Sequence, residues 1–295
     1  MGIWTGSSIK NNEPWQKKMK DRSAIKKRGV TGIILVLLII LSICKGQNTF
    51  IFLLLIINLL AVLEFYQLFF HAGVMPRVAM GSILSTCILM TVAFVVTGVA
   101  VSTIYLINIP LVSGIFISEL YRKAKNPFHD LAFTFLGIFM VTFPLCLFAT
   151  IAFLPVHSGK YHAQIVLGYF FILWASDTAA YLIGSALGKH ALFLRVSPAK
   201  TWEGSLAGVA GAFLVAYFVS RYFTGLSTTG WAAIASIIVI MGGYGDLIKS
   251  LIKRSLNVKD SGTILPGHGG MLDRFDTLLG SAPFVFSYLI LFPYA

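Results

Sequence analysis

Charged residues are scarce in this sequence. Only 12% of its 295 residues are Asp, Glu, Lys or Arg, and the acidic residues number 11. Because an ordinary soluble domain carries about 25% charged residues, water is not the main solvent of this chain. Its three cysteines, Cys44, Cys87 and Cys146, lie in apolar segments, which argues against a disulfide framework and a cysteine-ligated zinc site. No Walker loop occurs, which argues against a P-loop nucleotide site.

Long apolar runs dominate instead. Apolar residues make up 57% of the chain, and its mean hydropathy is +0.84. Several uncharged runs approach the ~20 residues that a helix needs to cross ~30 Å of hydrocarbon. The runs predict an all-α, polytopic membrane protein with about nine transmembrane helices, at residues 30–44, 48–70, 78–97, 99–118, 131–154, 165–187, 205–220, 229–248 and 277–293. The run 78–118 is too long for one crossing, which predicts a turn near Thr97 and Gly98.

The basic residues predict the orientation. With the N-terminus in the cytosol, only Lys45, Lys160 and Arg221 of the 23 basic residues fall on the outer side. The formal charge of +12 is then concentrated on one membrane face, which favours anionic headgroups or phosphates. The basic residues lie beside helix ends rather than along an aromatic-rich surface, so no nucleic acid is expected as a partner.

Three regions follow from this pattern. They are a basic cytosolic segment at 1–29, which lacks a clear cleavage site and is expected to be retained, transmembrane helices at 30–160, and a catalytic transmembrane region with cytosolic loops at 161–295. In the first half, Glu64 and Glu119 are expected at the cytosolic helix ends, where they reach water.

Asp177 interrupts an apolar segment about ten residues from its cytosolic end, hence ~15 Å deep. An Asp at a helix centre costs about 3 kcal/mol on insertion scales, so it usually faces a polar cavity or a cation. Ala180, Tyr181, Gly184 and Gly188 share its helical face, where small residues allow a helix or ligand to approach. A structural Asp that bonds a neighbouring helix is the alternative.

Two later stretches are polar. The predicted loop SPAKTWEG, residues 197–204, offers the Lys200 ammonium and the Ser197 and Thr201 hydroxyls to a phosphate. Trp202 suits either the membrane interface or base stacking.

The second stretch, residues 245–276, mixes charge of both signs with glycine. Asp273 and Asp276 would share one face of a helix, and hard carboxylate oxygens suit Mg²⁺ shared with substrate phosphates. Gly267, Gly269 and Gly270 would let backbone N–H groups approach an anion.

Together these motifs resemble the phosphatidate cytidylyltransferase family, also called CDP-diacylglycerol synthases. The residues that match its signature are Ser250, Lys253, Arg254, Lys259, Asp260, Gly262, Leu265, Pro266, His268, Gly269, Gly270, Asp273, Arg274 and Asp276. The resemblance extends to Asp177, to SPAKTWEG and to Gly245-Asp246, and it is strong over residues 170–280.

The resemblance implies a nucleotidyltransferase of phospholipid biosynthesis. CTP and phosphatidic acid would give CDP-diacylglycerol and pyrophosphate, with a divalent metal required. It implies catalytic roles for Asp246, Lys253, Arg254, Asp273 and Asp276. Substrate binding would fall to Ser197, Lys200, Thr201, Lys259, His268, Gly269, Gly270 and Arg274. Asp177, Asp246, Asp273 and Asp276 are the expected ligands of Mg²⁺, with room for a second metal ion.

The expected setting is a bacterial inner membrane, with the active site facing the cytosol. Membrane lipids are partners, and a homodimer is one option for the oligomeric state. Two alternatives remain open at this point. A CTP-dependent polyprenol or lipid kinase would use similar metal chemistry but release CDP, and a secondary transporter would also bury carboxylates, although nearer the bilayer midplane.

Overall fold

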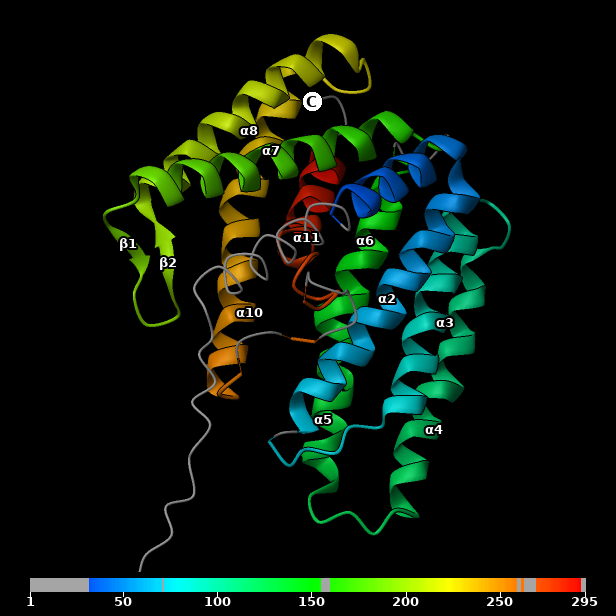
Figure 1. Ribbon diagram of the computed structural model, residues 1–295. Coiled ribbons are helices and arrows are strands. Elements are labelled where there is room, and N and C mark those ends of the chain that lie inside the picture. The colour runs from blue at the N-terminus through cyan, green and yellow to red at the C-terminus, as the bar shows by residue number, and fades with distance from the viewer. Residues whose placement is uncertain (1–31, 71, 155–159, 259–260, 263–268, 293–295) are drawn as a thin grey trace, which may run out of the picture.

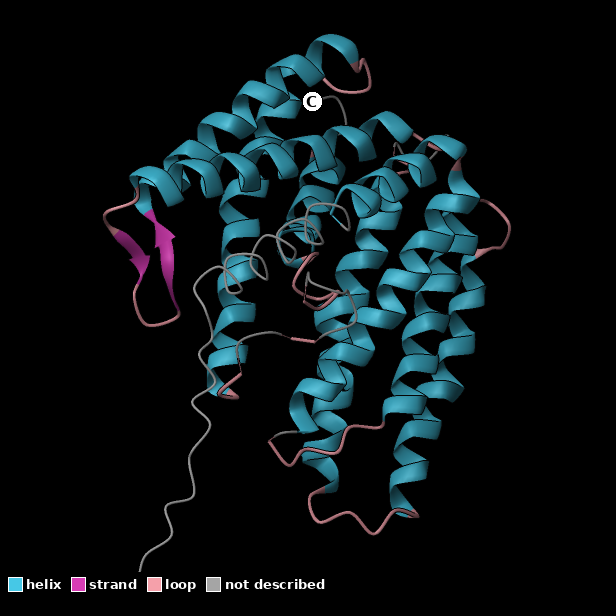
Figure 2. Cartoon of the chain, in the orientation of Figure 1, coloured by secondary structure: helices cyan, strands magenta, loops and turns pink. Residues whose placement is uncertain are grey.

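The computed structural model describes residues 32–70, 72–154, 160–258, 261–262 and 269–292. Most of the described residues are helical, and two short strands form a small hairpin (Figure 2). Helices are the expected result, because within a bilayer every backbone N–H and C=O must be satisfied inside its own segment.

The amino-terminal half is a group of roughly parallel helices (Figure 1). An apolar helix at Gly32–Lys45 leads into it. The elements that follow are α2 (Gln47–Phe70), α3 (Val78–Val96), the 3₁₀ turn η1 (Ser102–Ile107), α4 (Asn108–Leu120), α5 (Pro127–Gly137), the π-helical turn η2 (Ile138–Thr142) and α6 (Phe143–Ile151).

The carboxyl-terminal half begins with a helical hairpin that crosses the other helices obliquely (Figure 1). Its arms, α7 (Ala163–Leu187) and α8 (Trp202–Tyr222), pack closely along each other, and the strands β1 (Ala191–Phe193) and β2 (Ser197–Thr201) join them. The chain continues through α9 (Thr228–Ile237), the π-helical turn η3 (Ile238–Gly242), α10 (Gly243–Ser255) and α11 (Asp276–Leu291).

The predicted membrane architecture is confirmed at this level. Each of the nine predicted segments contains an apolar helix, and seven helices of the described chain are long and apolar enough to cross a membrane. Two further apolar helices, Gly32–Lys45 and Asp276–Leu291, are shorter, so nine crossings and a cytosolic N-terminus stay predictions. The turn predicted near Thr97 is present, where Gly98 adopts a positive φ of 74° between α3 and η1.

One local prediction was wrong. Residues 197–201 were expected in a loop but form β2, which pairs antiparallel with β1 and so satisfies its backbone groups. Glu203 in the first turn of α8 supports this hairpin by accepting hydrogen bonds from the backbone N–H groups of Lys189 and His190. The predicted crossing at 229–248 lies within a longer helical run, Thr228–Ser255, which α10 continues beyond the apolar residues.

The expectation for the two glutamates of the first half was also wrong. Glu64 is 0% exposed and Glu119 is 6% exposed, so neither reaches water. Other segments cover both helix ends, and Glu119 Oε2 lies 2.9 Å from Arg77 Nε at the start of α3. Pairing with an opposite charge is the usual condition for burying a carboxylate.

Candidate functional site

The carboxylates come together where α10 crosses α11. A Cβ added to Gly245 would lie 2.6 Å from the Cα of Gly280, and one added to Gly280 would lie equally close to the Cα of Gly245. Only glycine at both positions permits this approach of the two backbones. The crossing places Asp246, which follows Gly245, close to Asp276 at the start of α11.

Lys249 lies at the centre of this cluster and is only 7% exposed. Its Nζ lies 2.5 Å from Asp276 Oδ2 and 3.1 Å from Asp273 Oδ1, and it donates a hydrogen bond of 3.0 Å to the Leu272 carbonyl. This lysine was not among the predicted site residues. The signal was its spacing, since Asp246, Lys249 and Lys253 recur every three or four residues and share one face of α10.

Asp273 organises the segment before α11. It accepts hydrogen bonds from Lys253 Nζ at 2.8 Å, from the Ser261 N–H at 3.0 Å and from the Ser261 hydroxyl at 2.8 Å. Burial alone would raise the pKa of Asp273, but the charge of Lys249 and these hydrogen bonds outweigh it and hold the pKa below its usual range. Asp273 is therefore ionised and engaged with the protein on both oxygens.

The strand β2 contributes a further cation. Lys200 forms an ion pair with Asp246 Oδ2, and both side chains remain partly accessible. Thr201 acts as the N-cap of α8 by accepting a 3.2 Å hydrogen bond from the Gly204 N–H. The hairpin also contacts α10 through Arg254 Nε, which donates to the Val196 carbonyl at 3.4 Å. Ser197 stands three residues before Lys200 on the same strand.

Asp177 faces the same region from α7. Its side chain lies within electrostatic reach of Asp246, Asp276 and Lys200. The close approach predicted for its helical face is confirmed, because Gly184 packs directly on the backbone of Gly204 in α8. Tyr181, predicted on that face, is instead 73% exposed.

The remaining predicted site residues differ in where they lie. Lys259 and His268 lie outside the described residues. Gly269 has a φ of 79°, in the left-handed region that favours glycine, and lies beside Asp273. Gly270 is buried against Ser261 and Glu64, whereas Arg274 is exposed.

The donor set fits magnesium in part. Within the described residues, no three His, Cys, Asp or Glu side chains are grouped closely enough to form a complete metal site. Two carboxylates, Asp246 and Asp276, lie close together, and four aspartates face three lysines, so negative charge is in excess among these seven groups. Mg²⁺ is typically held by one or two carboxylates together with waters and substrate phosphates, which suits an incomplete protein site of this kind.

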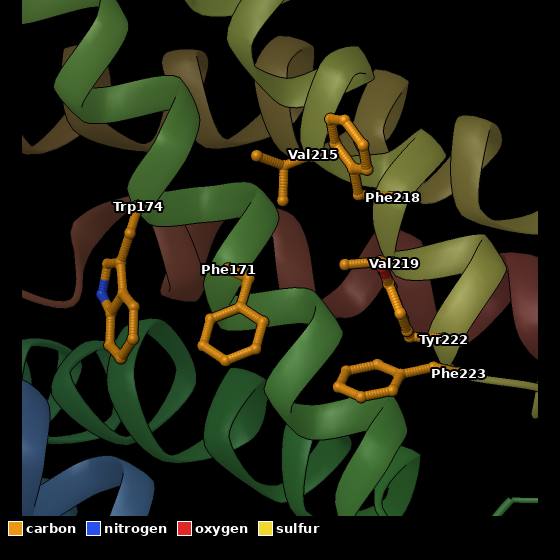
Figure 3. Close-up of a pocket in the computed structure, with 7 residues that line it drawn as sticks. All are labelled: Phe171, Trp174, Val215, Phe218, Val219, Tyr222 and Phe223. Atoms are coloured by element: carbon orange, nitrogen blue, oxygen red, sulfur yellow. The ribbon is translucent and has the colours of Figure 1, made fainter.

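An apolar cavity of about 590 Å³ lies between α7 and α8 (Figure 3). It begins at Trp174, about one helical turn along α7 from Asp177, and continues toward the carboxyl end of α8. The residues that line it are Phe171, Trp174, Val215, Phe218, Val219, Tyr222 and Phe223. Its lining residues include no charged group, so the cavity suits an apolar ligand.

The sequence is similar to a known protein family and to several known proteins. The model of the cytidylyltransferase family matches residues 26–292. A phosphatidate cytidylyltransferase of Staphylococcus haemolyticus is 32% identical over 90% of this chain and 99% of that protein. One of Haemophilus influenzae is 41% identical over 45% of the chain, and the uncharacterized protein YnbB of Escherichia coli is 35% identical over 63% of it. The matches span 48% and 63% of those two relatives.

Proposed function

The chain belongs to the cytidylyltransferase family, and from that premise we propose that it transfers CMP from CTP to phosphatidic acid. The products are CDP-diacylglycerol and pyrophosphate, and the enzyme is a nucleotidyltransferase of phospholipid biosynthesis. The observation that carries the proposal is the meeting of β2, α10 and the start of α11, which gathers three lysines and three aspartates. Such a cluster suits a reaction between two anionic phosphates.

The chemistry requires no covalent enzyme intermediate. An oxygen of the phosphatidate headgroup forms a bond to the α-phosphorus of CTP. The bond from that phosphorus to the oxygen bridging to the β-phosphate breaks, and pyrophosphate leaves with the electron pair. A phosphate monoester is already a competent nucleophile, so catalysis depends on positioning and on stabilising charge.

Lys200 and Lys253 are the cations best placed to meet the substrates. Each ammonium has three N–H donors, and the aspartate that it contacts occupies only part of them. Both side chains are partly accessible, whereas Lys249 is buried. We assign Lys200 and Lys253 to binding the triphosphate. Lys249 would reduce the repulsion between the carboxylates that it contacts.

Asp246 and Asp276 would hold Mg²⁺, with Asp177 as a third ligand from α7. When bound, the metal would neutralise the triphosphate and draw charge from the α-phosphate. Asp273 was predicted as a ligand as well, but it already accepts hydrogen bonds from Lys253 and Ser261. Its proposed role is to hold the loop before α11.

The lipid substrate would occupy the membrane side of the cluster. An acyl chain fits the apolar cavity between α7 and α8, because the cavity lies in membrane-spanning helices and starts one turn from Asp177. The phosphatidate headgroup would then lie at Asp177 and its acyl chain in the cavity, both along α7. The setting is the inner membrane of a bacterium, with the cluster facing the cytosol.

Turnover of labelled CTP by the purified protein tests the proposal. The protein in lipid nanodiscs is incubated with CTP labelled in the cytidine and with phosphatidate, with and without a chelator. We expect label in CDP-diacylglycerol, equimolar pyrophosphate, and no turnover with the chelator. Release of CDP with a phosphorylated lipid would identify a lipid kinase instead, and absence of any CTP turnover would overturn the proposal.

A further inference from the structure

Glu64 lies far from the signature residues in the sequence but contacts them in the structure. It belongs to α2 in the amino-terminal half and is 0% exposed. Its Oε2 accepts a hydrogen bond of 2.8 Å from the N–H of Leu272, 208 residues later. The adjacent N–H of Met271 also points to this carboxylate. A buried carboxyl group thus accepts from the backbone of the segment before α11.

Two glycines of that segment are shaped to the carboxylate. A Cβ added to Gly262 would lie 2.6 Å from Glu64 Oε1, and one added to Gly270 would lie 2.5 Å from Oε2. These distances are shorter than any contact that a real Cβ makes, so neither position accepts a larger residue while Glu64 stays in place. The two described ends of the loop, residues 261–262 and 269–272, therefore close over one side chain.

The same backbone is held from the opposite side. The Leu272 carbonyl accepts a hydrogen bond from Lys249 Nζ at 3.0 Å, while its N–H donates to Glu64. Asp273 follows directly and holds Ser261 through the N–H and the hydroxyl. The described part of the loop has no regular helix or strand, so these side-chain contacts help to fix its conformation, together with the turn in which the Arg274 N–H donates to the Met271 carbonyl.

We infer that Glu64 is a positioning residue, which holds the glycine loop 269–272 in the conformation that receives a substrate phosphate. This inference rests on the proposed function, since the phosphate is that of CTP. It makes the amino-terminal helices part of the active site, although none of the signature residues lies there. Glu64 does not touch substrate, and it acts through the Met271 and Leu272 amides.

Three substitutions test the role. Glu64→Ala removes the acceptor, Glu64→Asp withdraws it by one methylene, and Glu64→Gln keeps one acceptor oxygen at full length. Asn58→Leu is the matched control, because Asn58 is equally buried in α2 but bonds Ser85 Oγ at 2.8 Å, away from the loop. The KM for CTP, kcat and the hydrogen exchange of amides 269–273 are measured for each variant.

We expect Glu64→Ala and Glu64→Asp to raise the KM for CTP about tenfold and to speed exchange at Met271 and Leu272. Glu64→Gln should restore most of both properties, and Asn58→Leu should leave both unchanged even where it lowers the melting temperature. A KM and exchange pattern in Glu64→Asp equal to the wild type would overturn the inference. A raised KM for CTP and faster exchange at Met271 and Leu272 in Asn58→Leu would also overturn it, because the effect would then reflect general loosening of α2.

Hydrogen exchange distinguishes failure of this inference from failure of the proposed function. If the wild-type protein shows no CTP turnover, the exchange rates of the Glu64 and Asn58 variants still decide whether Glu64 holds the loop. Faster exchange confined to residues 269–273 in the Glu64 variants would support the positioning role on its own. Unchanged exchange would refute it whatever the substrate is.

Discussion

Two groups of buried charge, one in each half of the chain, differ in their balance. The arginine cluster of the first half, Arg77, Glu119, Arg122 and Asp130, pairs two cations with two anions. Its groups also bond the backbone and side chains of the neighbouring helices, as Arg77 Nη2 does with Ser118 Oγ at 2.8 Å and Asp130 Oδ1 does with the Met75 N–H at 2.9 Å. This cluster joins the α2–α3 connection to α4 and α5.

The lysine cluster of the second half, Lys200, Lys249, Lys253, Asp177, Asp246, Asp273 and Asp276, has more anions than cations among its described members. Several of its groups stay partly accessible, and glycines allow the close backbone approach of α10 and α11 beside it. Buried charge by itself therefore does not mark a site. An excess of one sign separates the two clusters, since both have partly accessible side chains.

Removing one carboxylate should lower activity in the lysine cluster but stability in the arginine cluster. Asp246→Asn removes an anion that faces Lys200 and the proposed metal, so we expect CDP-diacylglycerol formation to fall about 10³-fold with an unchanged melting temperature. Glu119→Gln leaves Arg77 unpaired, so it should cost about 3 kcal/mol of stability and leave the kcat of the folded fraction unaltered. Activity assays and thermal unfolding in detergent measure both. Full activity of Asp246→Asn would remove that residue from the site.

The glycine crossing that assembles the lysine cluster offers a second contrast. Gly245→Ala places a methyl against the Gly280 backbone and should displace Asp246 from Asp276, lowering activity about 10²-fold because small misplacements of reacting groups are costly. Gly243→Ala is the control, since a Cβ there meets nothing within 4 Å. Equal activities of the two variants would show that the α10–α11 contact does not set the geometry.

A smaller effect is expected at Lys253. Replacing it with alanine removes one donor to the triphosphate and one partner of Asp273, so the KM for CTP should rise about tenfold with little change in kcat. Arg221→Ala, at the far end of α8, is a control with the same loss of charge. Steady-state kinetics at varied CTP separates the two parameters. An unchanged KM in Lys253→Ala would assign this lysine to holding the loop alone.

The smallest effect concerns the apolar cavity, which has no counterpart in the arginine cluster. Val219→Trp fills the space between α7 and α8, so activity on long-chain phosphatidate should fall several-fold relative to a short-chain analogue. Leu214→Trp changes an outward-facing residue of the same helix, 60% exposed, and should leave the ratio unaltered. A constant ratio in Val219→Trp would place the acyl chain elsewhere.

Much of the site was predictable because its residues lie close together in sequence. Lys253, Asp273 and Asp276 fall within one polar stretch of an apolar chain, and the structure brings them to one cluster with Asp246. Lys200, 46 residues before Asp246, was predicted from its own polar motif and reaches the cluster from β2. Their roles toward metal and substrate remain predictions.

Glu64 and Lys249 were not predicted as site residues. Glu64 follows an apolar run at the end of a membrane helix, a pattern that is equally typical of a solvated helix end. Its burial depends on which segment covers that end, and this segment comes more than 200 residues later. The β1–β2 hairpin was missed for a related reason, since pairing between short strands depends on the turn and on Glu203.

By itself the sequence determined the helical membrane architecture, because apolar length sets which segments enter a bilayer, and it determined the family through the spacing of its polar residues. Only the tertiary structure decided which charges face one another. Helix crossings at glycines and the folding of one loop over Glu64 depend on contacts between distant segments, and no local pattern encodes these contacts.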